Sequence, residues 1–174
     1  MREHFAAPWS TKLKTTTVVF VGILLVAAYA ARGWASLLIL AIFLVAAAFA
    51  IRGYSVREGK LLIHRLGWAT TYDLAKLINA EVSPGATIGS IRAMGIGGLF
   101  GFVGHFHNAV LGSYKAYATN ELNTVVLDLA GDRIVVTPDD PHEFVAAVQA
   151  AHDSLQSRPA GETWSEGDAH PDRR

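Results

Sequence analysis

The N-terminal part of the chain is dominated by two apolar runs that carry no charge. They cover Thr15 to Ala31 and Gly33 to Ile51, and Arg32 separates them. At 1.5 Å per residue, helices over these runs would be about 26 and 28 Å long. The hydrocarbon core of a bilayer is about 30 Å thick, so one helix over both runs would be about twice too long. The pattern therefore predicts a transmembrane helical hairpin over residues 15–52.

Basic residues flank both ends of this predicted hairpin. They are Arg2, Lys12, Lys14, Arg52, Arg57 and Lys60. The turn between the runs carries only Arg32, so the positive-inside bias places both ends in the cytoplasm. This predicts a multi-pass protein of the cell (plasma) membrane, with residues 1–14 as a cytoplasmic segment. The alternative is a signal peptide cleaved after Ala28-Tyr29-Ala30, which is disfavoured because the second apolar run begins almost at once.

The predicted hairpin has the character of an anchor. Residues 15–51 contain no Asp, Glu, Lys or His, the side chains that usually mark ion or proton paths in a bilayer. Ala27 and Ala31, and likewise Ala46 and Ala50, have the small-xxx-small spacing that lets helices approach closely. The simpler interpretation is packing within the hairpin, and the alternative is association with a second copy of the chain.

After Gly53 the pattern changes to short strands separated by turn residues. Seven strands are predicted, over residues 54–56, 61–65, 69–74, 77–83, 114–119, 124–129 and 133–137. Gly131-Asp132 is a good two-residue turn between the last two strands.

A helix with strong N-terminal signals follows these strands. Asp140 suits the N-cap, Pro141 falls at the first helical position, and Glu143 stands three residues after the cap. Its apolar stripe consists of Phe144, Val148, Ala151 and Leu155. The polar composition of residues 158–174 predicts a disordered tail.

Together these elements predict an α+β domain over residues 53–157, formed by a bent antiparallel sheet and a covering helix. Three segments add a resemblance: residues 97–106, residues 111–120, and Val136-Thr137-Pro138-Asp139-Asp140-Pro141 leading to Glu143-Phe144. In these segments the sequence resembles the bacterial pleckstrin-homology-like domain family, in its membrane-anchored form with two transmembrane helices. The resemblance implies a seven-stranded bent sheet with a C-terminal helix and a binding or scaffolding role. It brings no catalytic residues.

The segment from Met94 to Gly112 is the most unusual part of the predicted domain. It lies between the fourth and fifth predicted strands, it is too long for a plain connection, and it is too apolar for plain disorder. Leu99, Phe100 and Phe102 are its candidate contact residues, toward the inner leaflet, the hairpin or a partner. The alternative is a structural plug that folds back over the sheet, and burial is expected for Phe106.

Several other chemistries are disfavoured by the sequence. Phe100 stands where a dinucleotide loop starting at Gly95 would need glycine, and no P-loop Lys-Ser/Thr pair follows. His64, His105 and His107 are too few for a zinc site. Fifteen basic and fifteen acidic side chains cancel, which argues against nucleic acid, and the chain has no cysteine for disulfides or thiolate sites. We therefore predict no metal, no cofactor and no catalytic residues.

The first hairpin of the domain offers a second candidate surface. Arg57, Lys60 and Arg65 are cations suited to an anionic leaflet, although the turn between the strands is short for a headgroup cradle. The sequence as a whole predicts a non-enzymatic cytoplasmic interaction or scaffolding module that binds a protein or peptide partner at the membrane. One alternative is a lipid-sensing module that uses residues 94–112 and the basic hairpin. Another is an accessory subunit of a membrane enzyme or transporter.

Overall fold

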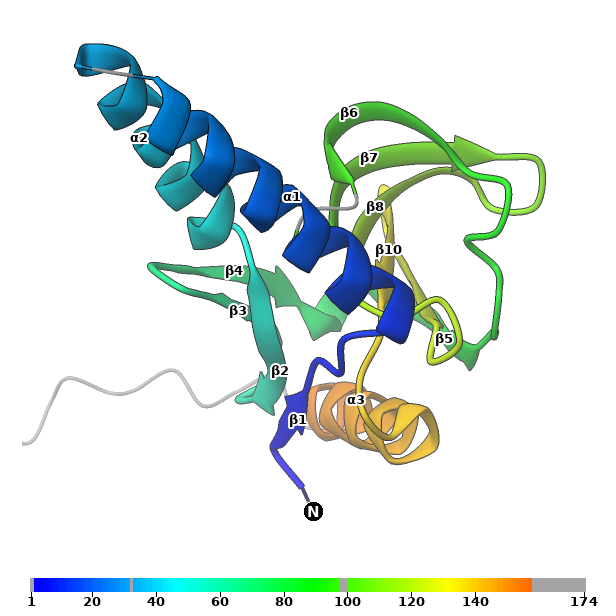
Figure 1. Cartoon of the computed structure of the whole chain (residues 1–174). Coiled ribbons are helices and arrows are strands. Elements are labelled where there is room, and N and C mark those ends of the chain that lie inside the picture. The colour runs from blue at the N-terminus through cyan, green and yellow to red at the C-terminus, as the bar shows by residue number, and fades with distance from the viewer. Residues whose placement is uncertain (1, 32, 98–99, 158–174) are drawn as a thin grey trace, which may run out of the picture.

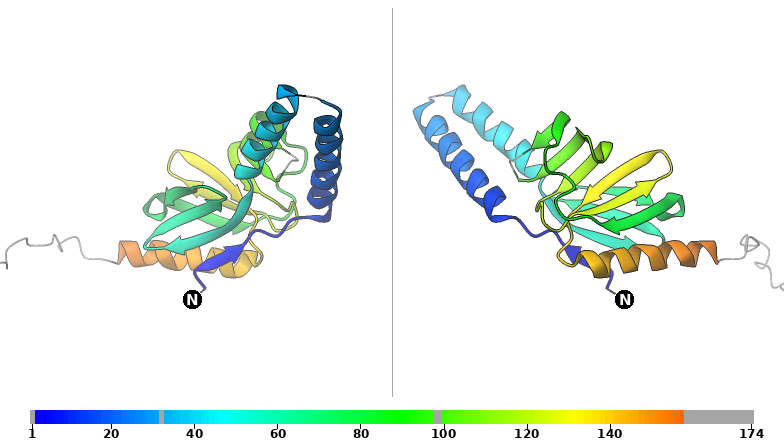
Figure 2. Two further views of the ribbon diagram at one scale, coloured as in Figure 1. Left: turned by 60° about the vertical axis from the view of Figure 1, so that its left-hand side comes forward. Right: turned by 90° about the vertical axis from the view of Figure 1, so that its right-hand side faces the viewer.

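In the computed structural model of the chain, two helices project together from a body of β-strands, and a third helix lies on the far side of that body (Figures 1 and 2). The structure describes residues 2–31, 33–97 and 100–157. The predicted tail at 158–174 and the candidate residue Leu99 lie outside the described residues.

The projecting pair consists of α1 (Thr11–Ala30) and α2 (Trp34–Ala48). Ser10 caps α1, since its hydroxyl accepts a hydrogen bond from the Leu13 N–H. By length and composition, α1 alone among the described helices is long and apolar enough to cross a membrane. The apolar helix α2 has 15 residues, or about 22 Å, and is shorter than a typical hydrocarbon core.

A four-stranded sheet joins the two ends of this helix pair. Its order is β1 (His4–Ala6), β2 (Ile51–Arg57), β3 (Lys60–Arg65) and β4 (Ala69–Asp73), all antiparallel. The strand β1 precedes α1, whereas β2 follows α2. The sequence assigned no strand to residues 1–14, because a three-residue strand leaves too short a pattern to recognise.

The second sheet has six strands in the order β5-β9-β10-β8-β7-β6. They are β5 (Leu77–Val82), β6 (Ile91–Gly97), β7 (Phe102–Asn108), β8 (Gly112–Ala118), β9 (Val125–Leu129) and β10 (Asp132–Val136), and a short 3-10 helix, η1 (Leu74–Lys76), links β4 to β5. The described chain thus has ten strands against the seven predicted. The expectation of a wholly antiparallel sheet was also wrong, because β10 lies between β9 and β8 and pairs in parallel with β8.

The main core lies between the two sheets and α3 (Pro141–Gln156). Asp140 caps α3 by accepting from the Glu143 N–H at 2.9 Å, and Phe144 and Val148 are fully buried, as the sequence predicted. The Phe144 ring meets Phe5 edge-on at 5.1 Å. The Tyr54 hydroxyl donates to the Tyr117 carbonyl at 2.6 Å, and burial raises the pKa of Tyr54 to about 12.

Candidate functional site

The glycine- and phenylalanine-rich segment forms a β-hairpin, not the long connection that the sequence indicated. Its strands β6 and β7 pair closely where Gly95 and Gly104 face each other. A Cβ on Gly95 would collide with the Val103 carbonyl, and one on Gly104 would collide with the Met94 carbonyl. Both glycines have positive φ, at 124° and 139°, a conformation that other residues rarely adopt. Glycine therefore permits this pairing, and it also removes the usual sequence signs of a strand.

Phe100 sits at the tip of this hairpin and contacts both projecting helices. Its ring lies 6.0 Å from the Trp9 ring and 5.7 Å from the Phe43 ring of α2. Its backbone N–H donates to the Thr17 hydroxyl of α1 at 3.4 Å, and its φ of 61° is unusual for a bulky residue. The sequence left the inner leaflet, the helical hairpin and a partner open as contacts of Phe100. The structure places Phe100 against the helices of the hairpin.

Phe102 and Phe106 belong to a second, smaller core on the outer face of the six-stranded sheet. Phe106 is buried, as expected, and stacks on Tyr114 with ring centres 6.0 Å apart. Phe102 is half-buried and packs at the edge of the same cluster. The candidate residues of this segment therefore point in different directions, Phe100 to the helices and Phe102 to the sheet face.

The three basic candidates do not share one surface. Arg57 and Lys60 form the last pair of β2 and β3, whereas Arg65 pairs with Ile51 at the other end, where α2 meets the sheet. Five residues of strand separate Lys60 from Arg65 by about 17 Å. Arg57 is also engaged, since its Nε donates to a Glu3 carboxylate oxygen at 2.8 Å.

Arg65 lies in an aromatic enclosure beside the end of α2. Its guanidinium is 5.8 Å from the Phe49 ring, 5.5 Å from the Trp68 ring and 5.2 Å from the Tyr117 ring. Phe49 directly follows α2 and meets Trp68 edge-on at 5.0 Å. Such contacts are favourable cation–π arrangements. They fix the β3–β4 turn, with its exposed Leu66, next to the base of the projecting helices.

Two histidines share one serine hydroxyl on the outer face of the four-stranded sheet. His4 Nδ1 and His64 Nε2 lie 2.9 and 2.8 Å from Ser55 Oγ. Their rings are 5.8 Å apart, and burial, followed by the nearby His4 and Arg57, lowers the pKa of His64. Among the described residues no group of three His, Cys, Asp or Glu side chains is placed to hold a metal ion.

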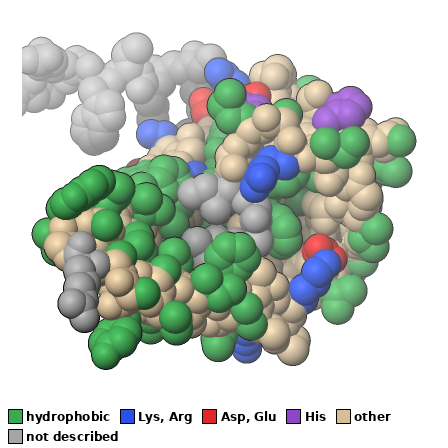
Figure 3. All heavy atoms as spheres, turned by 45° about the horizontal axis from the view of Figure 1, so that its top comes forward, with side chains coloured by type: hydrophobic (Ala, Val, Ile, Leu, Met, Phe, Trp, Pro, Cys, Tyr) green, Lys and Arg blue, Asp and Glu red, His purple; other side chains and the backbone are tan. Residues whose placement is uncertain are grey.

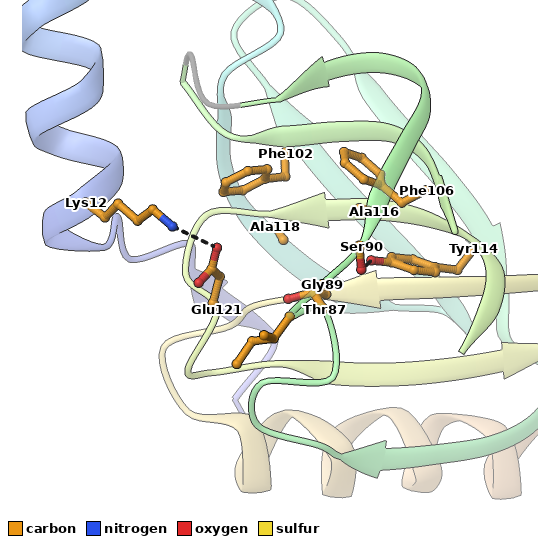
Figure 4. A pocket seen from close by; sticks show the side chains of 11 residues that line it. Lys12, Thr87, Gly89, Ser90, Phe102, Phe106, Tyr114, Ala116, Ala118 and Glu121 are labelled. Carbon is orange, nitrogen blue, oxygen red and sulfur yellow. Dashed lines mark hydrogen bonds and ion pairs between the residues drawn. The ribbon is translucent and has the colours of Figure 1, made fainter. Parts of the chain in front are cut away.

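A cavity of about 220 Å³ opens on the outer face of the six-stranded sheet. Its lining includes Phe102 and Phe106 of β7, Tyr114 and Ala118 of β8, and Ser90 before β6 (Figure 4). Lys12 of α1 and Glu121 face each other at its mouth, with Nζ and Oε1 3.7 Å apart.

One comparison with known proteins identifies the family of the chain. A family model described as Bacterial PH domain matches residues 52–151, which is more than half of the chain. The chain belongs to the bacterial PH domain family. The resemblance seen in the sequence is confirmed for this domain, whose matched part runs from β2 into α3, so that β1, α1 and α2 lie outside it. No curated protein and no solved structure matches the chain.

Some residues of these sites escaped the sequence-based reasoning. Phe49, Trp68 and Tyr117 surround Arg65 but are far apart in the chain, and nothing in their spacing indicates a common location. Ala116 and Ala118 stand in the cavity among aromatic residues. The one available signal was their alternation with Tyr117 along β8, which places both alanines on one face of the strand.

Proposed function

We propose that this PH-domain chain is a membrane-anchored cytoplasmic interaction module, without catalytic activity, that binds a protein or peptide partner. In this account α1 and α2 both sit in the membrane as the anchor, and the PH domain presents the binding surface. Membership of the bacterial PH domain family supports an interaction role. The observation that carries the proposal is the exposed apolar surface of α1 and α2, two helices whose chain ends are held together by the pairing of β1 with β2.

From Val18 to Ala30 in α1, and in α2 apart from Ser36, the side chains are apolar or aromatic, and apolar side chains cover much of the face seen in Figure 3. Val26 is 70% exposed, Tyr29 92% and Leu37 68%. Burying apolar surface is worth roughly 25 cal/mol per Å², and soluble proteins rarely expose contiguous apolar patches of this kind. Lipid would cover this surface without any further folding of the chain.

The pairing of β1 with β2 supports a hairpin that enters and leaves the membrane on one side. The strand before α1 and the strand after α2 are neighbours in one sheet, so both ends of the helix pair are held together. A second span in the short helix α2 requires local thinning of the bilayer or flanking residues that reach the interface. The basic residues before α1 and after α2 favour the cytoplasmic side for both ends.

A fixed orientation of the domain on its anchor is consistent with scaffolding. Phe100 holds the β6–β7 hairpin against α1 and α2, and Phe49 holds the β3–β4 turn against the base of α2. A domain attached at two such points presents the same surface to every partner. This lowers the ordering cost of binding.

A lipid-contact role is the second candidate, and it rests on the surroundings of Arg65. Trp68 and Leu66 are exposed beside the base of α2, where aromatic and basic side chains suit the headgroup region of a bilayer. Arg57 and Lys60, at the far end of the same strands, do not support this role.

Purification of the full chain from native membranes in mild detergent, after cross-linking in the cells, tests the proposal. We expect a protein at near-stoichiometric ratio, retained at moderate salt. The control is the same chain carrying a helix-breaking substitution in α3, Val148→Pro, which should unfold the domain and lose the partner while the anchor remains. Recovery of lipid alone, with salt-sensitive binding to anionic vesicles, would favour the lipid-contact role instead.

A further inference from the structure

The hollow on the outer face of the six-stranded sheet is encoded by the residues that oppose each other on β7 and β8. Phe106 lies opposite Tyr114, Gly104 opposite Ala116, and Phe102 opposite Ala118. Large side chains thus fill one end of this strand pair, whereas small ones occupy the centre and part of the other end. A sheet face built in this way is low in its middle and high at its aromatic borders.

The β5–β6 connection covers part of this face, and hydrogen bonds hold both of its ends: the Gly85 N–H donates to the Glu121 carbonyl at 3.0 Å, and Asn108 and Tyr114 bind the end that leads into β6. The Asn108 side-chain amide donates to the Ala86 carbonyl at 2.7 Å and to the Ser90 hydroxyl at 3.0 Å, and the Tyr114 hydroxyl donates to the same Ser90 oxygen at 2.6 Å. These bonds fix the β5–β6 connection over Phe106 and Tyr114. Toward Ala118 the face remains open up to the first turn of α1, and this opening is the cavity of about 220 Å³.

The size of the cavity restricts what can enter it. An apolar cavity of about 150 Å³ accepts a benzene-sized group, and pockets for drug-sized ligands begin at about 300 Å³. A volume of about 220 Å³ therefore suits one leucine or phenylalanine side chain. Pockets that accept one anchoring side chain are typical of the energetic centres of protein interfaces.

The mouth of the cavity carries both signs of charge. The Lys12 and Glu121 side chains are 78% and 40% exposed, and Ile88, also at the mouth, is 69% exposed. A fatty acid carboxylate could reach Lys12 only by competing with the Glu121 carboxylate, which already lies 3.7 Å from the Lys12 ammonium, and the two carboxylates would repel each other. A polypeptide brings neutral amide groups, which both donate and accept hydrogen bonds, together with apolar neighbours for Ile88. The charge pattern thus favours a peptide over an anionic lipid.

We infer that this cavity receives one leucine- or phenylalanine-sized side chain of the partner protein. The inference rests on the proposed function and names the surface through which it acts. Because the mouth adjoins the first turn of α1, the partner segment runs close to the place where α1 enters the membrane. The partner segment therefore carries an accessible leucine or phenylalanine and lies close to the membrane surface.

Methyl NMR of the alanine residues in the full chain, reconstituted in lipid nanodiscs, tests this inference. The probes are N-acetyl-phenylalanine amide and N-acetyl-leucine amide, with sodium octanoate as the lipid-like comparison. Either amide should shift the Ala116 and Ala118 methyl signals in a saturable way and leave the Ala147 methyl, buried in the main core, unchanged. The substitution Ala118→Leu should fill the cavity and weaken the apparent affinity at least tenfold. The matched control Ala69→Leu, at an exposed position of β4, should not.

Three results would overturn the inference: no shift with either amide, shifts with octanoate alone, or equal shifts at Ala147. If Ala118→Leu prevents folding, the comparison of Ala116 and Ala118 with Ala147 in the unchanged chain still decides the question. If the NMR titration is negative but a protein partner is still recovered from membranes, the cavity is not the binding site and the proposed function stands. Failure of that recovery would instead reject the proposed function.

Discussion

Phe5 and Tyr54 are direct neighbours across strands β1 and β2, although the whole of α1 and α2 lies between them in the chain. Both are fully buried, and the rings of both contact Phe144 of α3. The short segment before α1 is therefore part of the folded domain. The complete four-stranded sheet therefore forms only when the segment before α1 and the segment after α2 lie next to each other.

Removal of the Phe5 ring should destabilise the PH domain itself. Phe5→Ala leaves a cavity against Phe144 and Tyr54, and such substitutions at fully buried sites cost about 3–5 kcal/mol. The free energy of unfolding of the full chain in detergent, measured with urea, gives this value. Phe20→Ala, at an exposed position of α1, is the matched control and should change it by less than about 0.5 kcal/mol. Equal effects of the two substitutions would show that β1 is not part of the domain.

The contact of the β6–β7 tip with α1 can be tested by disulfide formation, because the chain has no cysteine of its own. The Phe100 backbone nitrogen lies 3.4 Å from the Thr17 hydroxyl. The double substitution Phe100→Cys with Thr17→Cys should therefore cross-link under mild oxidation in membranes. Phe100→Cys with Val26→Cys, more than two helical turns further along α1, should not. Absence of the first cross-link would mean that the domain is loosely tethered to its helices.

The close approach of β6 and β7 makes Gly104 sensitive to substitution. Gly104→Ala would force a Cβ against the Met94 carbonyl at a backbone conformation with positive φ. We expect a loss of about 2 kcal/mol or more in the free energy of unfolding. Gly67→Ala, where a Cβ would meet open space, should be almost neutral. A neutral Gly104→Ala would argue that residues 94–112 form a loop after all.

The partial burial of His64, beside His4 and Arg57, lowers the pKa of His64 and predicts a dependence of stability on pH. Since the folded state lowers the pKa of His64, the unfolded chain binds more protons as the pH falls below about 6.5. The contribution of His64 to the free energy of unfolding should thus be fully present above that pH. It should decrease as the pH falls toward the pKa of His64 in the folded state. Urea midpoints at pH 7.5 and 5.5 should differ less in His64→Gln than in the unchanged chain. His107→Gln, whose ring is exposed, should keep the full difference.

Local signals in the sequence were sufficient for α3 and for the short hairpins. The N-cap at Asp140, Pro141 at the helix start and the buried stripe through Phe144 are all set by residues close together in the chain. The same holds for the turns around Gly59 and Gly131, which have positive φ. These elements could be predicted because their own residues specify them.

The remaining features depend on contacts between distant segments. The strand β1 exists because Phe5 finds a place beside Tyr54, and the parallel pair of β8 and β10 depends on the path of the chain between them. The enclosure of Arg65 gathers Phe49, Trp68 and Tyr117 from separate elements. None of these relationships has a periodic pattern, so no examination of short windows can find them.

The central claim, a membrane hairpin with both of its ends in the cytoplasm, is tested most directly by cysteine labelling in intact cells. Trp34→Cys places a thiol at the start of α2, at the end of the helix pair remote from the sheets, and Ser154→Cys places one on the exposed side of α3. A membrane-impermeant maleimide should label the Trp34→Cys chain before lysis and the Ser154→Cys chain only after the membrane is permeabilised. Labelling of the Ser154→Cys chain in intact cells, or of neither chain before lysis, would contradict the account.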